Sequence, residues 1–317
     1  MKFPVFDLHC DTALALLGEK FYADGLLRKN AFHIDLERAG KLAGYAQCFA
    51  CFTSPLEKLP ARMTIEDMFE RQMSVLLREV NGNEDVICQA YSALDIQENR
   101  QAGKMSAIFT IEGPAGFGYD PALLENLYQI GFRITTLGWN ESNPLTGSHI
   151  TGEGLSEQGK EYVREAQRVG MIVDVSHISD KGFWDIMEIT SAPVIASHSN
   201  SRSVHPATRN ITDDMFRAIC KTGGVVGINL GAQFVAEDAD LDAVCDHILH
   251  FLKLDPTGKH IALGGDLDGV SQLPRGFEGI QSYDALAEKL IGRGVKEETV
   301  MDIYWNNAFG VIQKCCM

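Results

Sequence analysis

Short apolar runs recur along the chain, and each is followed by polar residues. Eight runs have this form: Phe3 to His9, Tyr45 to Phe52, Ser106 to Gly113, Arg133 to Trp139, Ile172 to His177, Val194 to His198, Gly224 to Leu230, and His260 to Gly269. Runs without strict polar alternation are typical of strands that are buried on both faces. The pattern therefore predicts a sheet with helices on its surface.

Segments with helical spacing of apolar residues separate most of these strands. We expect helices at Asp35 to Leu42, Thr64 to Val80, Pro121 to Ile130, Ser156 to Val169, Asp180 to Ile189, Thr212 to Lys221, Ala239 to Leu254, Tyr283 to Ile291, Glu297 to Asn307, and Ala308 to Lys314. Such alternation favours a parallel sheet, and eight units favour a closed (β/α)8 TIM-type barrel. A doubly wound open sheet is the alternative, because the same alternation fits both folds.

Composition and charge narrow the class of protein. The 317 residues are 45% hydrophobic and 22% charged, which is ordinary for a globular α/β protein with a large core. Since no linker, repeat or low-complexity tract interrupts the pattern, we expect one domain over residues 1–317. The formal net charge of −15 disfavours binding to nucleic acid or to anionic lipid.

The beginning of the chain and the cysteines bear on the compartment. The chain starts Met1-Lys2-Phe3-Pro4 and enters a strand almost at once, without the features of a signal peptide or a membrane span. Cys48-Phe49-Ala50-Cys51 has the spacing of a redox motif but lies in a predicted strand, so we expect buried free thiols. These features predict a cytoplasmic protein that binds no membrane.

Polar residues of metal-binding type follow five of the predicted strands: His9, Asp11, Glu112, His177, His198, Asp266 and Asp268. His177 and His198 are 21 residues apart, which fits one step from a strand through a helix to the next strand. In barrels, the C-terminal ends of the strands carry the active site. We therefore expect these side chains to meet at one end of the barrel.

Imidazole and carboxylate groups are ligands that hold zinc and leave room for water. Three histidines and several carboxylates exceed the needs of one catalytic ion, whereas two ions sharing a carboxylate would use them all. A hydroxide that bridges two such ions is a strong nucleophile at neutral pH. Taken singly, each residue also fits a structural role, such as a core histidine or an Asp-Gly turn. Their joint placement at five strand ends favours a functional site.

Six segments resemble the membrane (renal) dipeptidase family of zinc metallopeptidases, which have amidohydrolase-like barrels. In chain order they are Asp7-Leu8-His9-Cys10-Asp11-Thr12, Ile111-Glu112-Gly113, Asp174-Val175-Ser176-His177-Ile178-Ser179, Ala196-Ser197-His198-Ser199-Asn200, Arg209-Asn210-Ile211-Thr212-Asp213-Asp214, and Gly264-Gly265-Asp266-Leu267-Asp268-Gly269. Any one segment is a weak signal, but the ordered set is specific. It spans residues 7 to 269 and therefore most of the chain.

The resemblance implies a ligand set for two Zn²⁺ ions. His9 and Asp11 would bind one zinc, His177 and His198 would bind the other, and Glu112 would bridge both. A residue such as Asp174 or Ser176 would orient the ligand histidines, although spacing alone does not show which one.

The resemblance also implies the reaction. Asp266 would be the acid and base beside a bridging hydroxide that attacks the amide bond of a dipeptide, with Asp268 the less favoured candidate. Arg209 would bind the substrate carboxylate through its guanidinium fork. The alternative for Arg209 is a surface ion pair with Asp213 or Asp214. Tolerance of a C-terminal D-residue and a homodimer are further expectations from the resemblance.

One segment departs from the family pattern. Where better-known members have a substrate-binding histidine, in a Thr-Leu-Thr-His pattern, this chain has Thr136-Leu137-Gly138-Trp139-Asn140. Trp139 is either a wall of the substrate pocket or a core aromatic at the barrel rim, and His149 is a candidate substitute for the histidine.

Two other functions stay open. With Phe117 and Tyr119, Trp139 would suit the acyl chain of an N-acyl-amino acid, which makes a deacylase on the same metal site the alternative activity. A non-catalytic binding protein that kept the fold, or a purely structural metal site, is the third possibility. The intact set of expected ligands argues against it.

Overall fold

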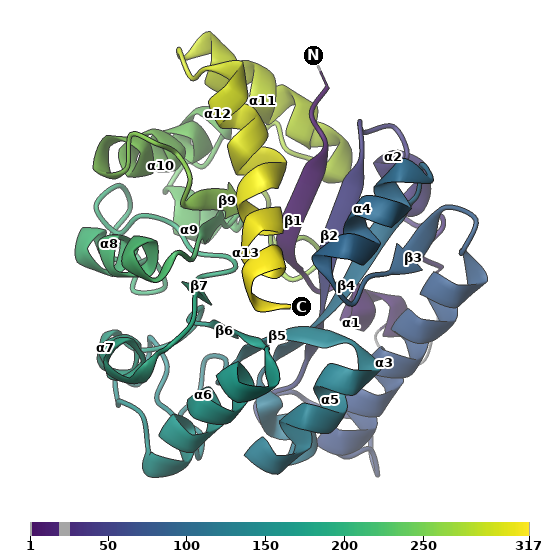
Figure 1. The fold of residues 1–317 in the computed structure, drawn as a ribbon, viewed down its shortest axis with the longest axis vertical. Helices are drawn as coiled ribbons and strands as arrows, with labels where there is room; N and C mark the ends of the chain where they lie inside the picture. The colour runs from purple at the N-terminus through teal and green to yellow at the C-terminus, as the bar shows by residue number, and fades with distance from the viewer. Residues whose placement is uncertain (1, 19–25, 317) are drawn as a thin grey trace.

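Parallel strands form a barrel at the centre of the molecule, and helices surround it (Figure 1). The computed structural model describes residues 2–18 and 26–316. Within them the strands are β1 Val5–Cys10, β2 Tyr45–Phe52, β3 Ile87–Gln89, β4 Met105–Glu112, β5 Phe132–Thr136, β6 Ile172–Asp174, β7 Val194–Ile195, β8 Val226–Ile228 and β9 Ile261–Leu263.

The strand order shows how the sheet closes on itself. It runs β7-β6-β5-β4-β2-β1-β9-β8, and neighbouring strands pair in parallel. A parallel bridge between Ala196 and Val226 then joins the regions of β7 and β8 at the two ends of this order. The predicted barrel is therefore confirmed, and the doubly wound open sheet is excluded.

Helices follow most strands and pack around the outside of the barrel (Figure 1). They are α1 Thr12–Leu17, α2 Leu36–Ala39, α3 Ile65–Gly82, α4 Ala93–Gln101, α5 Leu124–Ile130, α6 Glu157–Val169, α7 Asp180–Ile189, α8 Asp213–Thr222, α9 Ala232–Val235, α10 Leu241–Leu254, α11 Tyr283–Gly292, α12 Glu297–Met301 and α13 Asn307–Cys315. Several begin with a side-chain cap, as when Ser156 and Thr212 accept hydrogen bonds from the first turns of α6 and α8.

The structure differs from the predicted elements in several places. It adds the short helices α1 and α9, the strand β3, which pairs with the first residues of β4 beside the barrel path, and α4 after it. A three-residue strand is too short to show a pattern, but the Ser92 cap that accepts a hydrogen bond from the Asp95 amide marks the start of α4. The predicted break before Ala308 is wrong, because a π-helical turn, Asp302–Asn306, joins α12 directly to α13.

Two apolar clusters build the core. The larger lies between the strands and the surrounding helices, and the smaller fills the barrel interior. Inward residues such as Phe6, Ile108 and Ile172 belong to the smaller cluster together with Val311 and Ile312 of α13. In Figure 1, α13 crosses the barrel. The final helix thus closes the end of the barrel where the strands begin, so the polar site must open at the other end.

Two glycines let the last strands approach each other. A Cβ atom on Gly227 would lie 1.9 Å from the carbonyl oxygen of Ser197, and one on Gly264 would lie 1.8 Å from the same oxygen. Any larger residue would therefore force the backbone apart. This close approach sets the end of β7, which carries His198, beside the ends of β8 and β9.

The structure shows the state of the cysteines and the character of the described helices. All eight cysteines lie in the described part and are free thiols, with Cys48 and Cys51 buried inside β2. Burial raises the pKa of both of these thiols, which makes them poor nucleophiles. Among the helices that the structure describes, none has both the length and the apolar character to cross a bilayer.

Candidate metal centre and active site

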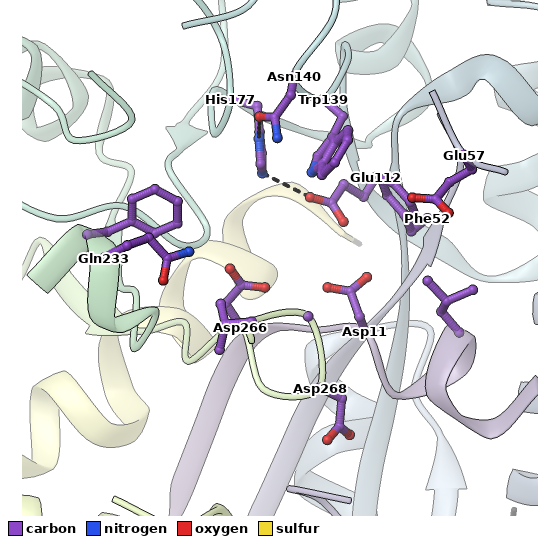
Figure 2. A pocket seen from close by; sticks show the side chains of 14 residues that line it. Asp11, Phe52, Glu57, Glu112, Trp139, Asn140, His177, Gln233, Asp266 and Asp268 are labelled. Carbon is purple, nitrogen blue, oxygen red and sulfur yellow. Dashed lines mark hydrogen bonds and ion pairs between the residues drawn. The ribbon is translucent and has the colours of Figure 1, made fainter. Parts of the chain in front are cut away.

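The C-terminal ends of the strands bring the predicted residues together at the mouth of the barrel. His9 lies in β1, Glu112 ends β4, and His177, His198 and Asp266 follow β6, β7 and β9. All five side chains are buried. Figure 2 shows Asp11, Glu112, His177 and Asp266 directed into one cavity.

Glu112 lies between two groups of possible ligands. Its Oε1 atom is 3.0 Å from His177 Nε2 and 3.6 Å from His198 Nε2. Its Oε2 atom is 3.4 Å from His9 Nε2, and His9 Nε2 is also 3.4 Å from Asp11 Oδ2. Each carboxylate oxygen of Glu112 therefore faces a different group.

Hydrogen bonds fix the tautomers of His177 and His198. His177 Nδ1 lies 3.0 Å from Asn140 Oδ1, which only accepts, so Nδ1 carries the proton. Ser197 Oγ donates to Asp174 Oδ2, so it must accept from His198 Nδ1, which lies 2.7 Å away. Both Nε2 atoms are then unprotonated.

These two Nε2 atoms lie only 3.0 Å apart and face the same point. Burial lowers the pKa of both histidines well below the usual value, with nearby positive groups such as Arg209 adding to the effect. Two lone pairs this close repel each other unless a cation lies beside both. The pair thus suits a metal ion.

The second group of possible ligands, His9 and Asp11, has pKa values that are raised rather than lowered. Burial lowers the pKa of His9, but the Glu112 and Asp11 carboxylates outweigh it and raise the value well above the usual one. Burial and the Glu112 charge raise the pKa of Asp11 to about 6. Within the described residues, His9 Nε2 and Asp11 Oδ1 are buried without a hydrogen-bond partner. The carboxylates of Asp11 and Glu112 therefore favour a positive charge at this point of the site.

Distances among the donor atoms agree with metal binding. One ligand atom each from His9, Glu112 and His198 lie within 4.8 Å of one another, and so do those of His9, Asp11 and Asp266. Imidazole nitrogen and carboxylate oxygen suit zinc and similar divalent ions. The residues present therefore fit a metal centre at the position expected from the sequence.

Two buried aspartates hold the ligands from behind. Asp174, at the end of β6, accepts from the Ser197 hydroxyl and, at 2.9 Å, from the Ser197 amide, and thereby fixes His198. Asp7 accepts from the His9 amide at 2.9 Å and from the hydroxyl of Tyr283. Asp174 was one of two predicted candidates, whereas Asp7, Ser197 and Tyr283 were not anticipated.

Strained backbone occurs at three of the predicted site residues. The φ angles of His177, Asp266 and Asp268 are 68°, 55° and 68°, and all three lie in the left-handed region that non-glycine residues avoid. Each such residue costs about 1–3 kcal/mol and is retained where the surrounding structure fixes it. His177 and Asp266 direct their side chains from the strand ends into the cavity (Figure 2).

Asp266 and Asp268 have different surroundings, although they are two residues apart. Asp266 lines the cavity and accepts a hydrogen bond from Asn229 Nδ2 at 3.0 Å. Burial raises the pKa of Asp266 to about 8, with the Asp11 and Glu112 charges adding to the rise. Asp268 instead accepts from the Thr12 hydroxyl at 2.7 Å and the His33 amide at 2.6 Å. Only Asp266 keeps a carboxylate oxygen available for chemistry.

Arg209 is a buried cation without a carboxylate partner. Arg209 is only 4% exposed, and its Nη1 atom donates a hydrogen bond to Ser199 Oγ at 2.8 Å. Its Nε and Nη2 atoms have no partner in the described part of the chain. The alternative surface pair is not formed, because Asp213 pairs with His250 and Asp214 with Arg217.

A cavity of about 230 Å³ opens over these residues. Its lining comprises Asp11, Leu14, Phe52, Glu57, Glu112, Trp139, Asn140, His177, Gln233, Phe234, Asp266, Asp268, Gly269 and Val270. Trp139 is thus a cavity wall, packed edge-on against Phe52 with ring centroids 5.1 Å apart. Phe117 and Tyr119 are absent from the described lining, and the Phe117 ring packs against Phe69 instead.

His149 does not replace the expected histidine at the cavity surface. Its Nε2 atom lies 3.0 Å from Asn140 Oδ1, and its Nδ1 atom lies 2.9 Å from the Thr208 hydroxyl. Asn140 therefore stands between His149 and His177 and accepts from both rings. Asn140 lines the cavity and was not anticipated, because its contact with His177 joins residues that are 37 positions apart.

Comparisons with known proteins identify the family of the chain. The family model for the membrane dipeptidases matches residues 1–316. An uncharacterized dipeptidase from Schizosaccharomyces pombe is 34% identical over 65% of this chain, and the chain spans about half (52%) of that relative. The dipeptidase aclJ of Aspergillus oryzae is 29% identical over 98% of this chain and 78% of its own length.

The fold has a close counterpart among solved structures. A metallo peptidase from Rhodobacter sphaeroides, liganded with a phosphinate mimic of the dipeptide L-Ala-D-Ala, matches 99% of this chain and 100% of its own. The two share 25% sequence identity and a TM-score of 0.88. The chain belongs to the membrane dipeptidase family, peptidase family M19, and its barrel is that of a metallo-dipeptidase.

Proposed function

We propose that this protein is a zinc-dependent dipeptidase with a binuclear metal site. The observation that carries the proposal is the position of Glu112, whose two carboxylate oxygens face separate groups of buried ligands. His9 and Asp11 would hold one ion, His177 and His198 the other, and Glu112 both. Two divalent ions in this place would polarise a carbonyl group and lower the pKa of a water molecule.

Arg209 supplies the binding of the substrate carboxylate. A buried guanidinium with two unpartnered nitrogens is costly unless an anion pairs with it. The α-carboxylate at the C-terminal end of a dipeptide offers two oxygens to such a fork. This contact supports a substrate with a free carboxyl terminus, held so that its amide bond lies over Glu112.

Asp266 supplies the proton transfer. Its carboxylate lies in the cavity wall and is oriented by Asn229, so it is placed to take a proton from the attacking water. It then delivers that proton to the nitrogen of the leaving amino group. A pKa near neutrality, as Asp266 has, suits a group that must both accept and donate a proton.

The proposal for the stereochemistry of the substrate rests on similarity to a solved structure. The Rhodobacter sphaeroides structure holds a mimic of L-Ala-D-Ala, and its barrel matches this one over nearly the whole chain. We propose by analogy that this protein also accepts a D-residue at the C-terminal position. An N-acyl-amino-acid deacylase is the second candidate, because the apolar wall formed by Phe52 and Trp139 would also accommodate an acyl chain.

A substrate panel tests the proposal. The protein is assayed with L,L, L,D and D,D dipeptides and with N-acyl amino acids, before chelation, after chelation, and after zinc is restored. We expect hydrolysis of L,L and L,D dipeptides that chelation abolishes and zinc restores. Hydrolysis of the N-acyl amino acids alone would show that the protein is a deacylase and not a dipeptidase. Activity that chelation does not affect would refute the metal mechanism.

A further inference from the structure

A carboxylate lines one side of the cavity, and the buried guanidinium of Arg209 lies close to a residue of the opposite side. Figure 2 shows Glu57 and Phe52 on one side of the cavity and Gln233 on the opposite side, with Glu112 and Asp266 between them. Phe234 follows Gln233 in α9, and the guanidinium carbon of Arg209 lies 6.0 Å from the centroid of the Phe234 ring. A carboxylate and a guanidinium therefore stand on opposite sides of the proposed metal centre.

The turn that carries Glu57 is firmly anchored. Ser54, at its start, is fully buried, and its hydroxyl donates to Glu141 Oε2 at 3.0 Å. The same hydroxyl accepts from the Leu56 amide at 3.1 Å, and the Ser54 carbonyl accepts from the Glu57 amide at 3.1 Å. Glu57 is thus presented to the cavity by a preformed turn.

Among residues 2–18 and 26–316, no ion pair balances the charge of Glu57, although Glu57 lines the cavity. Behind it, Glu141 is only 8% exposed, and its Oε1 atom is buried without a hydrogen-bond partner. Glu57 in the cavity lining, with Glu141 behind it, and a buried guanidinium with two unpartnered nitrogens near the opposite side would suit a ligand with opposite charges at its two ends.

We infer that Glu57 binds the free α-ammonium group of the substrate, while Arg209 binds its carboxylate. The inference rests on the proposed dipeptidase function and adds a specificity to it. A peptide whose amino terminus is acylated has lost the charge that Glu57 recognises, so the enzyme selects unblocked dipeptides over N-acyl compounds. Glu57, a side chain outside the metal centre, thus favours dipeptidase over deacylase activity.

The test compares free and N-acetylated forms of the same dipeptide on the zinc-loaded full-length protein. We expect the wild type to prefer the free form by roughly 10- to 100-fold in kcat/KM, the range of one charge-assisted hydrogen bond. Glu57→Gln should raise KM for the free dipeptide by a similar factor, change kcat little, and leave the N-acetylated form unaffected. Glu57→Lys should weaken binding of the free form further.

Glu84→Gln is the matched control, because Glu84 is exposed and lies outside the cavity lining. Thermal melting of each variant separates a loss of substrate contact from a loss of folding. Equal cleavage of free and acetylated dipeptides by the wild type, or an unchanged KM in a folded Glu57→Gln, would overturn this inference and leave the dipeptidase function standing. Cleavage of N-acyl amino acids without any cleavage of dipeptides would overturn both.

Discussion

Identical side chains two positions apart acquire different tasks through their partners. Asp266 faces the cavity with Asn229 behind it, whereas both oxygens of Asp268 are taken by Thr12 and by the His33 amide. The spacing along the sequence places both aspartates at the site. The preference for Asp266 over Asp268 comes only from the family resemblance. The contacts give the physical reason for that preference.

The two aspartates therefore respond differently to the same substitution. Asp266→Asn removes the proton-transfer group and should lower kcat by roughly 10²- to 10⁴-fold with the metal content unchanged. Asp268→Asn retains an oxygen for the His33 amide and should instead lower the free energy of unfolding by about 1 kcal/mol. Steady-state kinetics, metal analysis and denaturant unfolding of both variants measure this. A larger loss of kcat in Asp268→Asn would reverse the assignment.

Metal binding should release a proton from His9. The Glu112 and Asp11 carboxylates raise the pKa of His9 well above its usual value in the metal-free protein, which favours the protonated ring. A cation must displace that proton to reach Nε2, and metal affinity therefore rises with pH until the pH passes this pKa. Calorimetric titration with zinc in buffers of different ionisation enthalpy counts the protons released. Zinc uptake without proton release at pH 7 would show that His9 is not a ligand.

The candidate ligands could be predicted from their residue types and positions, but the contacts that support them could not. His9, Glu112 and His198 are metal-binding types at strand ends, a position that a barrel makes functional. The contact of Asp174 with Ser197 joins two strands, and that of Asp7 with Tyr283 spans most of the chain. Such partners depend on the three-dimensional register, which spacing along the sequence does not encode.

At the scale of the elements, the site depends on how closely the final strands approach each other. Gly227 and Gly264 both pack against the carbonyl of Ser197, next to the ligand His198. The eight barrel strands were predicted from their apolar runs. The extra β3 and α4 were not, since three residues carry no period and few of the α4 side chains are buried.

A matched pair of glycine substitutions tests the strand contact. Gly264→Ala would place a methyl group 1.8 Å from the Ser197 carbonyl oxygen and should cost roughly 1–3 kcal/mol of stability. Gly292→Ala, at the end of α11 with open space around it, should be neutral or stabilise by up to about 1 kcal/mol. Equilibrium denaturation compares the two. Equal stabilities would mean that the strands separate without cost.

At the scale of the whole molecule, one end of the barrel is closed and the other end carries the candidate active site. The smaller apolar cluster fills the barrel interior, α13 closes the end where the strands begin, and buried ionisable groups occupy the opposite mouth. The membership in the membrane dipeptidase family agrees with this layout. A single domain over residues 1–317 and a cytoplasmic location stay predictions.

Removal of metal should destabilise the entire barrel. The clustered carboxylates and facing histidines lose their balancing charge, and a ligand that binds only the folded state adds about 2.7 kcal/mol when present at 100 times its Kd. We expect chelation to lower the melting temperature and zinc to restore it. An unchanged melting temperature, with loss of metal verified, would show that the site contributes nothing to folding.

The number of metal ions per chain tests the central claim most directly. Zinc-reconstituted wild type and His177→Ala are compared by elemental analysis after removal of weakly bound ions. The account predicts two ions per chain in the wild type. In His177→Ala it predicts a loss confined to the ion between Glu112 and His198, with dipeptide hydrolysis abolished. A wild type that retains no ion, or a His177→Ala variant that keeps the full metal content and activity, would contradict it.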